Sequence, residues 1–164
     1  MRRYIFLWMI LVAINGAAQV NNQDLIHKVD SLQQQVAQLT YNYHYLDCAH
    51  KLDVLSLNLN DYINGMKNSV DRLLINVYNN NYNAELYKGA KMECEVSDEQ
   101  LTSYKTHFFI LKRGVSIDAE AYGFTEHDLK LLEDRCNVIE AAIKSAEVSL
   151  GMYKDMVAAM KEFF

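Results

Sequence analysis

The chain is 164 residues long and contains 16 Lys and Arg against 21 Asp and Glu, a net charge of −5 at pH 7. A surface with this acidic excess repels the phosphates of nucleic acids and of anionic membranes, so we expect neither as a partner. The length allows one domain with a real core, and because the sequence has no proline, nothing in it forces a long helix to end.

The first 18 residues have the pattern of a secretory signal peptide. Arg2 and Arg3 precede an apolar run over residues 4–14, and Ala18 ends a stretch of small residues that signal peptidase accepts. The apolar run is roughly a dozen residues, whereas a membrane-spanning helix needs about 20. We therefore expect cleavage after Ala18, export to the periplasm or the extracellular space, and no integral membrane segment after cleavage.

A long first helix is predicted over about residues 22–78. Two sets of apolar residues follow the alternating three- and four-residue spacing of one helical face, but they differ in frame. The next positions of the first frame are His50 and Asp53, which are polar and do not suit an apolar seam, so the frame must shift or end near them. The first set occupies the a and d positions of a coiled-coil pattern and comprises Leu25, Val29, Leu32, Val36, Leu39, Tyr43 and Leu46. The second set comprises Leu52, Leu55, Leu59, Tyr62, Met66, Val70, Leu73 and Val77.

A second helix is predicted over about residues 84–113, after an asparagine-rich turn. The stretch NVYNNNYN at residues 76–83 has no helical period, and Asn favours turns through local backbone hydrogen bonds. Gly114 is placed to end the helix. Two alternatives remain open here. Ser97 fits a capping box that would move the helix start to that residue, and KMECEV at residues 91–96 alternates like a short strand.

The third helix is predicted over about residues 125–163, after a linker at residues 115–124. Thr125 with Asp128 three residues later has the pattern of a helix start. Strict three-four spacing then continues to the end of the sequence, through Leu129, Leu132, Cys136, Ile139, Ile143, Ala146, Leu150, Tyr153, Val157, Met160 and Phe164.

These segments predict an all-α protein. A lone amphipathic helix cannot bury its apolar face, so the helices must pack on each other or on a partner. We expect an elongated antiparallel helical bundle with coiled-coil-like packing, in a single domain over residues 19–164. Three long helices are preferred because no Gly or Pro lies between Asp47 and Asn64. A break in the polar region 47–61 would instead give four helices, up-down-up-down.

The window YNYHYLDCAH at residues 41–50 gathers side chains that can carry chemistry. On a helix His44 and Cys48 lie one turn apart, a spacing that metal sites use, and Asp47 is within reach of both. These three residues are therefore the candidate metal ligands. The frame of the first apolar set places them on the outer face, where polar side chains are usually just solvated.

His50 is predicted at a buried seam position, paired with the carboxylate of Asp53. Cys48 and His50 are two residues apart and would point about 160° away from each other on a helix, which disfavours a catalytic Cys-His pair. The sequence also contains no GxSxG, HExxH or phosphate-cradling glycine-rich motif. We expect neither an enzyme nor a cofactor.

The tyrosines Tyr78, Tyr82 and Tyr87 cluster with asparagines near the end of the first predicted helix. Tyrosine is enriched where one edge of a side chain is apolar and the other is wet, so these three residues form a candidate interaction surface. The competing interpretation is that they are the wet border of the helical core.

Three cysteines, Cys48, Cys94 and Cys136, follow the predicted cleavage point. In an oxidising compartment an odd number leaves at least one thiol unpaired within the chain, available for an intermolecular bond or buried. Cys136 falls on the apolar face of the third helix and is predicted to be a buried thiol.

Together these features predict an exported, non-enzymatic helical protein that acts as a structural or protein-interaction module in the bacterial envelope or outside the cell. A protein partner or self-association is expected. The alternative is a metal- or small-ligand-binding helical bundle that uses the window at residues 41–50.

Overall fold

Three helices make up almost all of the described backbone in a computed structural model of the chain. Helix α1 spans Arg2–Tyr78, α2 spans Ala84–Tyr122 and α3 spans Glu126–Met160, and a short 3-10 helix, η1, follows over Lys161–Phe163. The all-α prediction is confirmed. No strand lies in the described backbone, so the strand alternative for residues 91–96 is wrong.

The structure describes the backbone of residues 2–81 and 83–163 and the side chains of residues 22–81 and 83–162. The signal peptide predicted at residues 1–18 therefore lies outside the described side chains, and it stays a prediction. Within the described residues, no helix combines the length and the apolar character that crossing a membrane requires.

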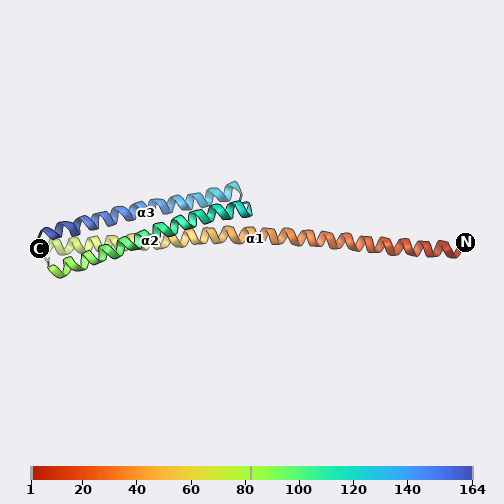
Figure 1. Cartoon of the computed structure of the whole chain (residues 1–164), viewed down its shortest axis with the longest axis horizontal. Helices are drawn as coiled ribbons and strands as arrows, with labels where there is room; N and C mark the ends of the chain where they lie inside the picture. The colour runs from red at the N-terminus through yellow and green to blue at the C-terminus, as the bar shows by residue number, and fades with distance from the viewer. Residues whose placement is uncertain (1, 82, 164) are drawn as a thin grey trace. The chain divides into compact units, whose positions relative to one another are not determined.

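In the unit formed by His44–Phe164, three helices lie side by side as a bundle (Figure 1). The contacts between α1 and α2 run in opposite sequence directions, because Tyr62 bonds to Ser97 and the later residue Ser69 bonds to the earlier residue Glu93. Neighbouring α2 and α3 also run antiparallel. Their ion pairs follow the same opposite order, and they join Lys154 to Asp98, Lys105 to Glu147 and Lys112 to Glu140. The antiparallel three-helix bundle is confirmed, and the four-helix alternative is wrong because α1 is continuous.

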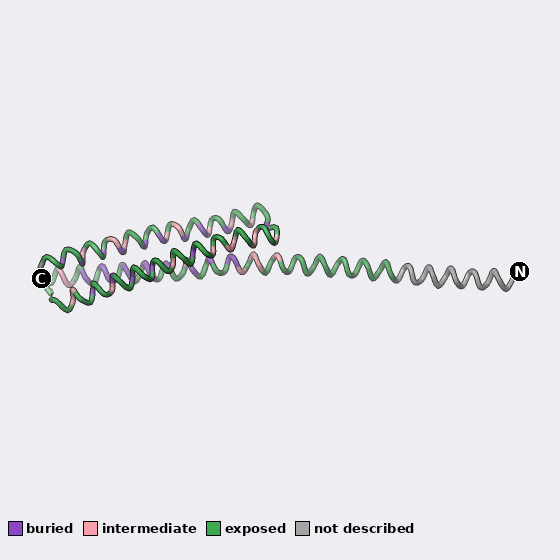
Figure 2. The backbone as a smooth tube through the Cα atoms, in the orientation of Figure 1, coloured by how far each residue is buried: buried purple, intermediate pink, exposed green. Residues whose placement is uncertain are grey.

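Each of the three helices contributes buried residues to the bundle (Figure 2), and nearly all of these are apolar. The second apolar set of α1 is buried from Leu52 to Leu73, and the apolar face of α3 is buried from Leu132 to Met160, whereas Leu129 is exposed. Burying a large apolar side chain contributes about 1.5–3 kcal/mol, so this core is the main source of stability. The largest fully buried side chains are Tyr153, Leu52, Leu55, Leu59, Leu132 and Ile139.

The turn between α1 and α2 is built by asparagines, as the sequence predicts. Helix α1 ends at Tyr78, and Asn80 adopts a left-handed backbone conformation with φ of 54°. Asn83 then caps α2, because its side-chain oxygen accepts a hydrogen bond of 2.7 Å from the backbone N–H of Leu86. The helix therefore begins well before Ser97, and the alternative start at that residue is wrong.

The end of α2 corrects two predictions. Gly114 lies inside the helix, which continues to Tyr122, so most of the linker predicted at residues 115–124 is helical. Gly123 ends the helix instead. Its φ of 68° is left-handed, and its N–H donates to the carbonyl of Ala119 at 3.0 Å.

The packing of Phe124 explains why α2 continues past Gly114. Phe124 is only 7% exposed, and its ring meets that of Tyr45 edge to face, with centroids 6.0 Å apart. Two further helical turns are needed to bring this ring to its partner on α1. The next residue, Thr125, begins α3 as predicted, because its hydroxyl accepts a hydrogen bond from the N–H of Asp128 at 3.2 Å.

The other unit, Met1–Tyr43, has described side chains from residue 22 onward. Nearly all of them are exposed (Figure 2), including the residues of the first apolar set from Leu25 to Tyr43, whose exposed fractions run from 47% for Val29 to 67% for Leu39. The helical spacing is as predicted, and the apolar side chains of this face are exposed. Local hydrogen bonds, such as the one from Lys28 to Asp24 at 2.8 Å, line its polar side.

Candidate functional site

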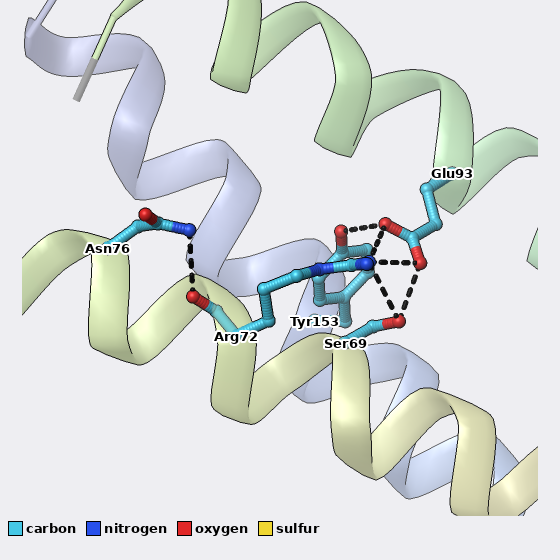
Figure 3. Close-up of polar contacts among 5 residues, drawn as sticks. All are labelled: Ser69, Arg72, Asn76, Glu93 and Tyr153. Carbon is cyan, nitrogen blue, oxygen red and sulfur yellow. Dashed lines mark hydrogen bonds and ion pairs between the residues drawn. The ribbon is translucent and has the colours of Figure 1, made fainter. Parts of the chain in front are cut away.

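A cluster of polar side chains joins all three helices of the bundle at Glu93 (Figure 3). Ser69 and Arg72 come from α1, Glu93 from α2 and Tyr153 from α3. Glu93 Oε1 accepts hydrogen bonds from Ser69 Oγ at 2.5 Å and from Arg72 Nη2 at 2.9 Å. Glu93 Oε2 accepts from Tyr153 Oη at 2.7 Å and from the same arginine nitrogen at 2.9 Å. We call these four residues the Glu93 cluster.

The charges of the Glu93 cluster are mutually satisfied. Burial raises the pKa of the Glu93 carboxyl, but hydrogen bonds from Ser69 and Tyr153 and the positive charge of Arg72 outweigh burial and lower this pKa below its usual range. Burial raises the pKa of the Tyr153 hydroxyl, and the bond to the Glu93 carboxylate raises it further. At neutral pH the carboxylate is therefore a charged acceptor and the tyrosine a protonated donor.

This arrangement suits a structural connection better than proton transfer. A general acid or base works best with a pKa near the working pH, and both Glu93 and Tyr153 are shifted away from neutrality. Hydrogen bonds to a charged group are roughly twice as strong as neutral ones, so the cluster fixes the position of the three helices along one another. Two residues come from α1 and one each from α2 and α3, so sliding α1 or α2 would break several of these bonds at once.

The Glu93 cluster was not predicted from the sequence. Ser69, Arg72 and Glu93 are ordinary polar residues of helices, and nothing in their spacing connects them. The one available signal is Tyr153, which sits on the apolar face of α3. A buried tyrosine hydroxyl needs a hydrogen-bond partner, so this position predicts a polar group on a neighbouring helix without saying which.

Two grooves open beside the Glu93 cluster, with volumes of about 470 and 310 Å³. In the larger one, Tyr62 donates its hydroxyl to the carbonyl of Ser97 at 3.0 Å, and its ring meets that of Tyr104 edge to face, with centroids 5.8 Å apart. Burial raises the pKa of Tyr62 to about 12, which keeps the hydroxyl a donor. The lining offers hydroxyls, amides and carboxylates, which bind water as readily as a polar ligand.

In the window at residues 41–50, two of the three candidate metal ligands meet an acid from another helix. His44 Nδ1 lies 3.6 Å from Asp118 Oδ2, and the imidazole stacks on the ring of Tyr122, with centroids 3.6 Å apart. Cys48 Sγ donates to the same Asp118 oxygen at 3.5 Å. Asp47 is engaged elsewhere, in an ion pair of 2.6 Å with Lys51.

The chemistry of this arrangement is that of a packed polar contact. Burial, the hydrogen bond to Asp118 and the negative charges of Asp118 and Asp47 raise the pKa of Cys48 to about 11, so the thiol is protonated at neutral pH. A protonated thiol is a poor nucleophile. Among the described side chains, no group of three or more His, Cys, Asp or Glu residues has the geometry to hold a metal ion. The metal site at His44, Asp47 and Cys48 stays a prediction from the sequence.

The exposure of this window corrects the predicted frame. Cys48 is only 6% exposed and is not on an outer face, whereas His50 is exposed rather than buried. Asp53 pairs with Arg135 of α3 at 3.0 Å instead of with His50. The reason is that the second apolar frame begins one turn before Leu52, at Cys48, so the frame shift precedes the histidine.

The candidate tyrosine surface is only partly described. Tyr78 is 88% exposed at the end of α1, and Tyr87 is half-buried on α2. Tyr82 lies outside the described residues. The arrangement of the three rings is therefore not tested, and the interaction surface at these residues stays a prediction.

The three cysteines are free and buried thiols. This confirms the prediction for Cys136, and burial raises the pKa of the Cys94 and Cys136 thiols as well.

Comparison of the chain with known proteins gave no relative. No protein-family model matches the sequence, and searches of curated proteins and of solved structures found no match.

Proposed function

We propose that the chain is an exported, non-enzymatic helical protein that acts as a structural or protein-interaction module in the bacterial envelope or outside the cell. One observation carries the proposal. The first apolar set has the three-four spacing of a helix interface, and its side chains are between 47% and 67% exposed. Regularly spaced apolar residues that stay in water are costly, and contiguous exposed apolar surface marks interaction sites.

The bundle supports this role as a closed scaffold. Its polar groups are matched with one another, since the Glu93 cluster is internally satisfied and Asp118 accepts from Cys48. No buried side-chain nitrogen or oxygen of the described residues lacks a hydrogen-bond partner. A scaffold of this kind presents a surface rather than a reactive centre. Export rests on the arginines and the apolar run of residues 1–18.

The interaction role is tested by photo-cross-linking in cells that express the full chain. A photoreactive amino acid replaces Leu32 on the apolar face, and in the control it replaces Gln34, which lies about 200° around the helix. We expect protein adducts from position 32 and far fewer from position 34. No adduct from position 32, or equal yields from both, would contradict an interaction surface on this face.

Export is tested on the same cells by mass spectrometry of the protein recovered from the periplasm and the medium. We expect a mature chain that begins at Gln19, because cleavage should follow Ala18. A chain that stays in the cytoplasm with an intact N-terminus would remove the envelope from the proposal and leave the interaction role to be judged on the cross-links alone.

A further inference from the structure

We propose that residues 25–39 pair with the same residues of a second copy of this chain in a parallel, two-stranded coiled coil. The surface concerned, called here the apolar stripe, consists of Leu25, Ile26, Val29, Leu32, Val36 and Leu39. This inference rests on the proposed function and names the partner of the same surface.

The residue types of the apolar stripe indicate how many helices pair in the coiled coil and whether they run parallel. In the heptad frame of this segment, the a positions are Val29 and Val36, and the d positions are Leu25, Leu32 and Leu39. β-Branched residues at a with leucine at d favour parallel dimers over trimers and tetramers, because of how each side chain packs into the facing helix. Both a positions and all three d positions follow this rule.

The charge around the apolar stripe favours a second copy over an oppositely charged partner. Residues 31–46 contain no Asp, Glu, Lys or Arg, although the chain as a whole has a net charge of −5. In a parallel pair, the flanking position Lys28 of one copy faces Gln33 of the other, and Gln35 faces Thr40. No pair of like charges meets, so two acidic chains can approach here without repulsion.

The area of the apolar stripe is sufficient for a dimer. Its six side chains are between 47% and 67% exposed. If each loses about 100 Å² of accessible surface, two copies bury on the order of 1,200 Å², which reaches the lower end of stable protein interfaces. Glutamines beside the stripe, such as Gln33 and Gln35, would add contact area at its edges.

Pairing also accounts for the helix itself. A single helix in water that buries no apolar face is marginal, and Val, Thr, Tyr and Asn are weak helix formers. The segment from residue 25 to residue 39 has one of these types, valine, at two positions of the exposed face, Val29 and Val36. A second copy would bury both valines and give the helix the packing that its sequence alone does not supply.

The mass of the purified mature protein is the first test. Sedimentation equilibrium should give twice the chain mass, unchanged between about 0.1 and 1 M NaCl because the stripe carries no charge. The double variant Leu32→Gln, Leu39→Gln should be a monomer with an unchanged bundle melting temperature. The matched control Leu57→Gln, Val148→Gln changes two exposed apolar residues of the bundle and should remain dimeric. A monomeric wild type, a trimer, or a dimeric stripe variant would overturn the proposal.

Direction is tested by two single variants, Leu25→Cys and Leu39→Cys, under mild oxidation. These positions are about 21 Å apart along the helix, so only a parallel pair lets each variant form a disulfide with its own copy. An antiparallel pair would cross-link only when the two variants are mixed, and this outcome would overturn the parallel arrangement. The wild type and Gln34→Cys are controls, since the native thiols are buried.

The cellular cross-links separate failure of this inference from failure of the proposed function. An adduct of twice the chain mass from position 32 supports the dimer. Adducts of another mass, with a monomeric purified protein, would overturn the dimer and leave the interaction role standing. No adducts at all would overturn both.

Discussion

Residues 25–39 and residues 52–73 have the same apolar spacing and opposite exposure. Leu32 is 59% exposed and Leu59 is 0% exposed, although each is a leucine in a three-four repeat of the same helix. Helices α2 and α3 pack on the second segment, whereas the apolar side chains of the first segment are exposed. Spacing therefore identifies a face that needs a partner, but it does not say whether that partner lies in the same chain.

The largest expected effect comes from truncating a leucine of the covered segment. Leu59→Ala should lower the free energy of unfolding by about 2–5 kcal/mol, because it opens a cavity in a closed core. Leu57→Ala is the matched control, since Leu57 lies two residues away and is 64% exposed. We expect it to cost within about 0.5 kcal/mol in chemical denaturation. Equal costs would mean that the buried face of α1 is assigned to the wrong residues.

The Glu93 cluster gives the bundle a polar connection that residues 25–39 lack. Glu93→Gln removes the charge that Arg72, Ser69 and Tyr153 share, and it should cost about 1–3 kcal/mol at pH 7. The control Glu99→Gln changes an exposed carboxylate of the same helix and should be nearly neutral.

The cost of Glu93→Gln should depend on pH. The pKa of Glu93 is lower in the folded chain than its unfolded value of about 4.3. The contribution of the Glu93 carboxylate to the free energy of unfolding is therefore fully present above that value and is lost as the pH falls through the folded pKa. The difference in unfolding free energy between wild type and variant should therefore shrink below about pH 4. A difference that stays constant down to pH 2 would contradict the charged state of the cluster.

Alanine substitutions at two glycines near the end of α2 should have smaller effects on stability, and the two effects should have opposite signs. A Cβ at Gly114 would meet no atom within 4 Å, and this residue lies inside the helix, so Gly114→Ala should stabilise by about 0.4–1 kcal/mol. Gly123 has a φ of 68°, so Gly123→Ala should destabilise by about 1–2 kcal/mol. The melting temperatures of the two variants, compared with that of the wild type, measure both effects. The reverse order would place the end of α2 at Gly114, as the sequence alone predicts.

The sequence predicts the helices well because apolar spacing and asparagine capping are local signals. Tyr78 ends α1 and Thr125 begins α3 where expected. The prediction is wrong where tertiary contacts determine the end of a helix. Helix α2 continues past Gly114 because Phe124 packs against Tyr45 of α1. The candidate site was less predictable. Asp118 and Glu93 are separated from their partners by at least 21 residues, so no pattern within one helix reveals them.

The frame shift at residues 47–52 shows how a small error moves a candidate site. The sequence frame ending at Leu46 puts Cys48 in solvent, but the residue belongs to the covered segment and is 6% exposed. A buried thiol bonded to Asp118 is a packing group, whereas an exposed one beside a histidine would be a candidate ligand. The functional interpretation of the window therefore depends on where one apolar frame replaces the other.

The smallest expected effect is the response of the melting temperature to a chelator. If the window at residues 41–50 belongs to the covered bundle as a packing contact, removing divalent metal should leave the melting temperature of the mature chain within about 1 °C, since only a ligand bound to the folded state shifts it. His44→Ala, Cys48→Ala should lower the melting temperature equally with and without chelator, because it removes the contacts to Asp118 and Tyr122. A chelator-dependent drop in wild type that the double variant lacks, together with stoichiometric metal in elemental analysis, would instead establish a metal site there.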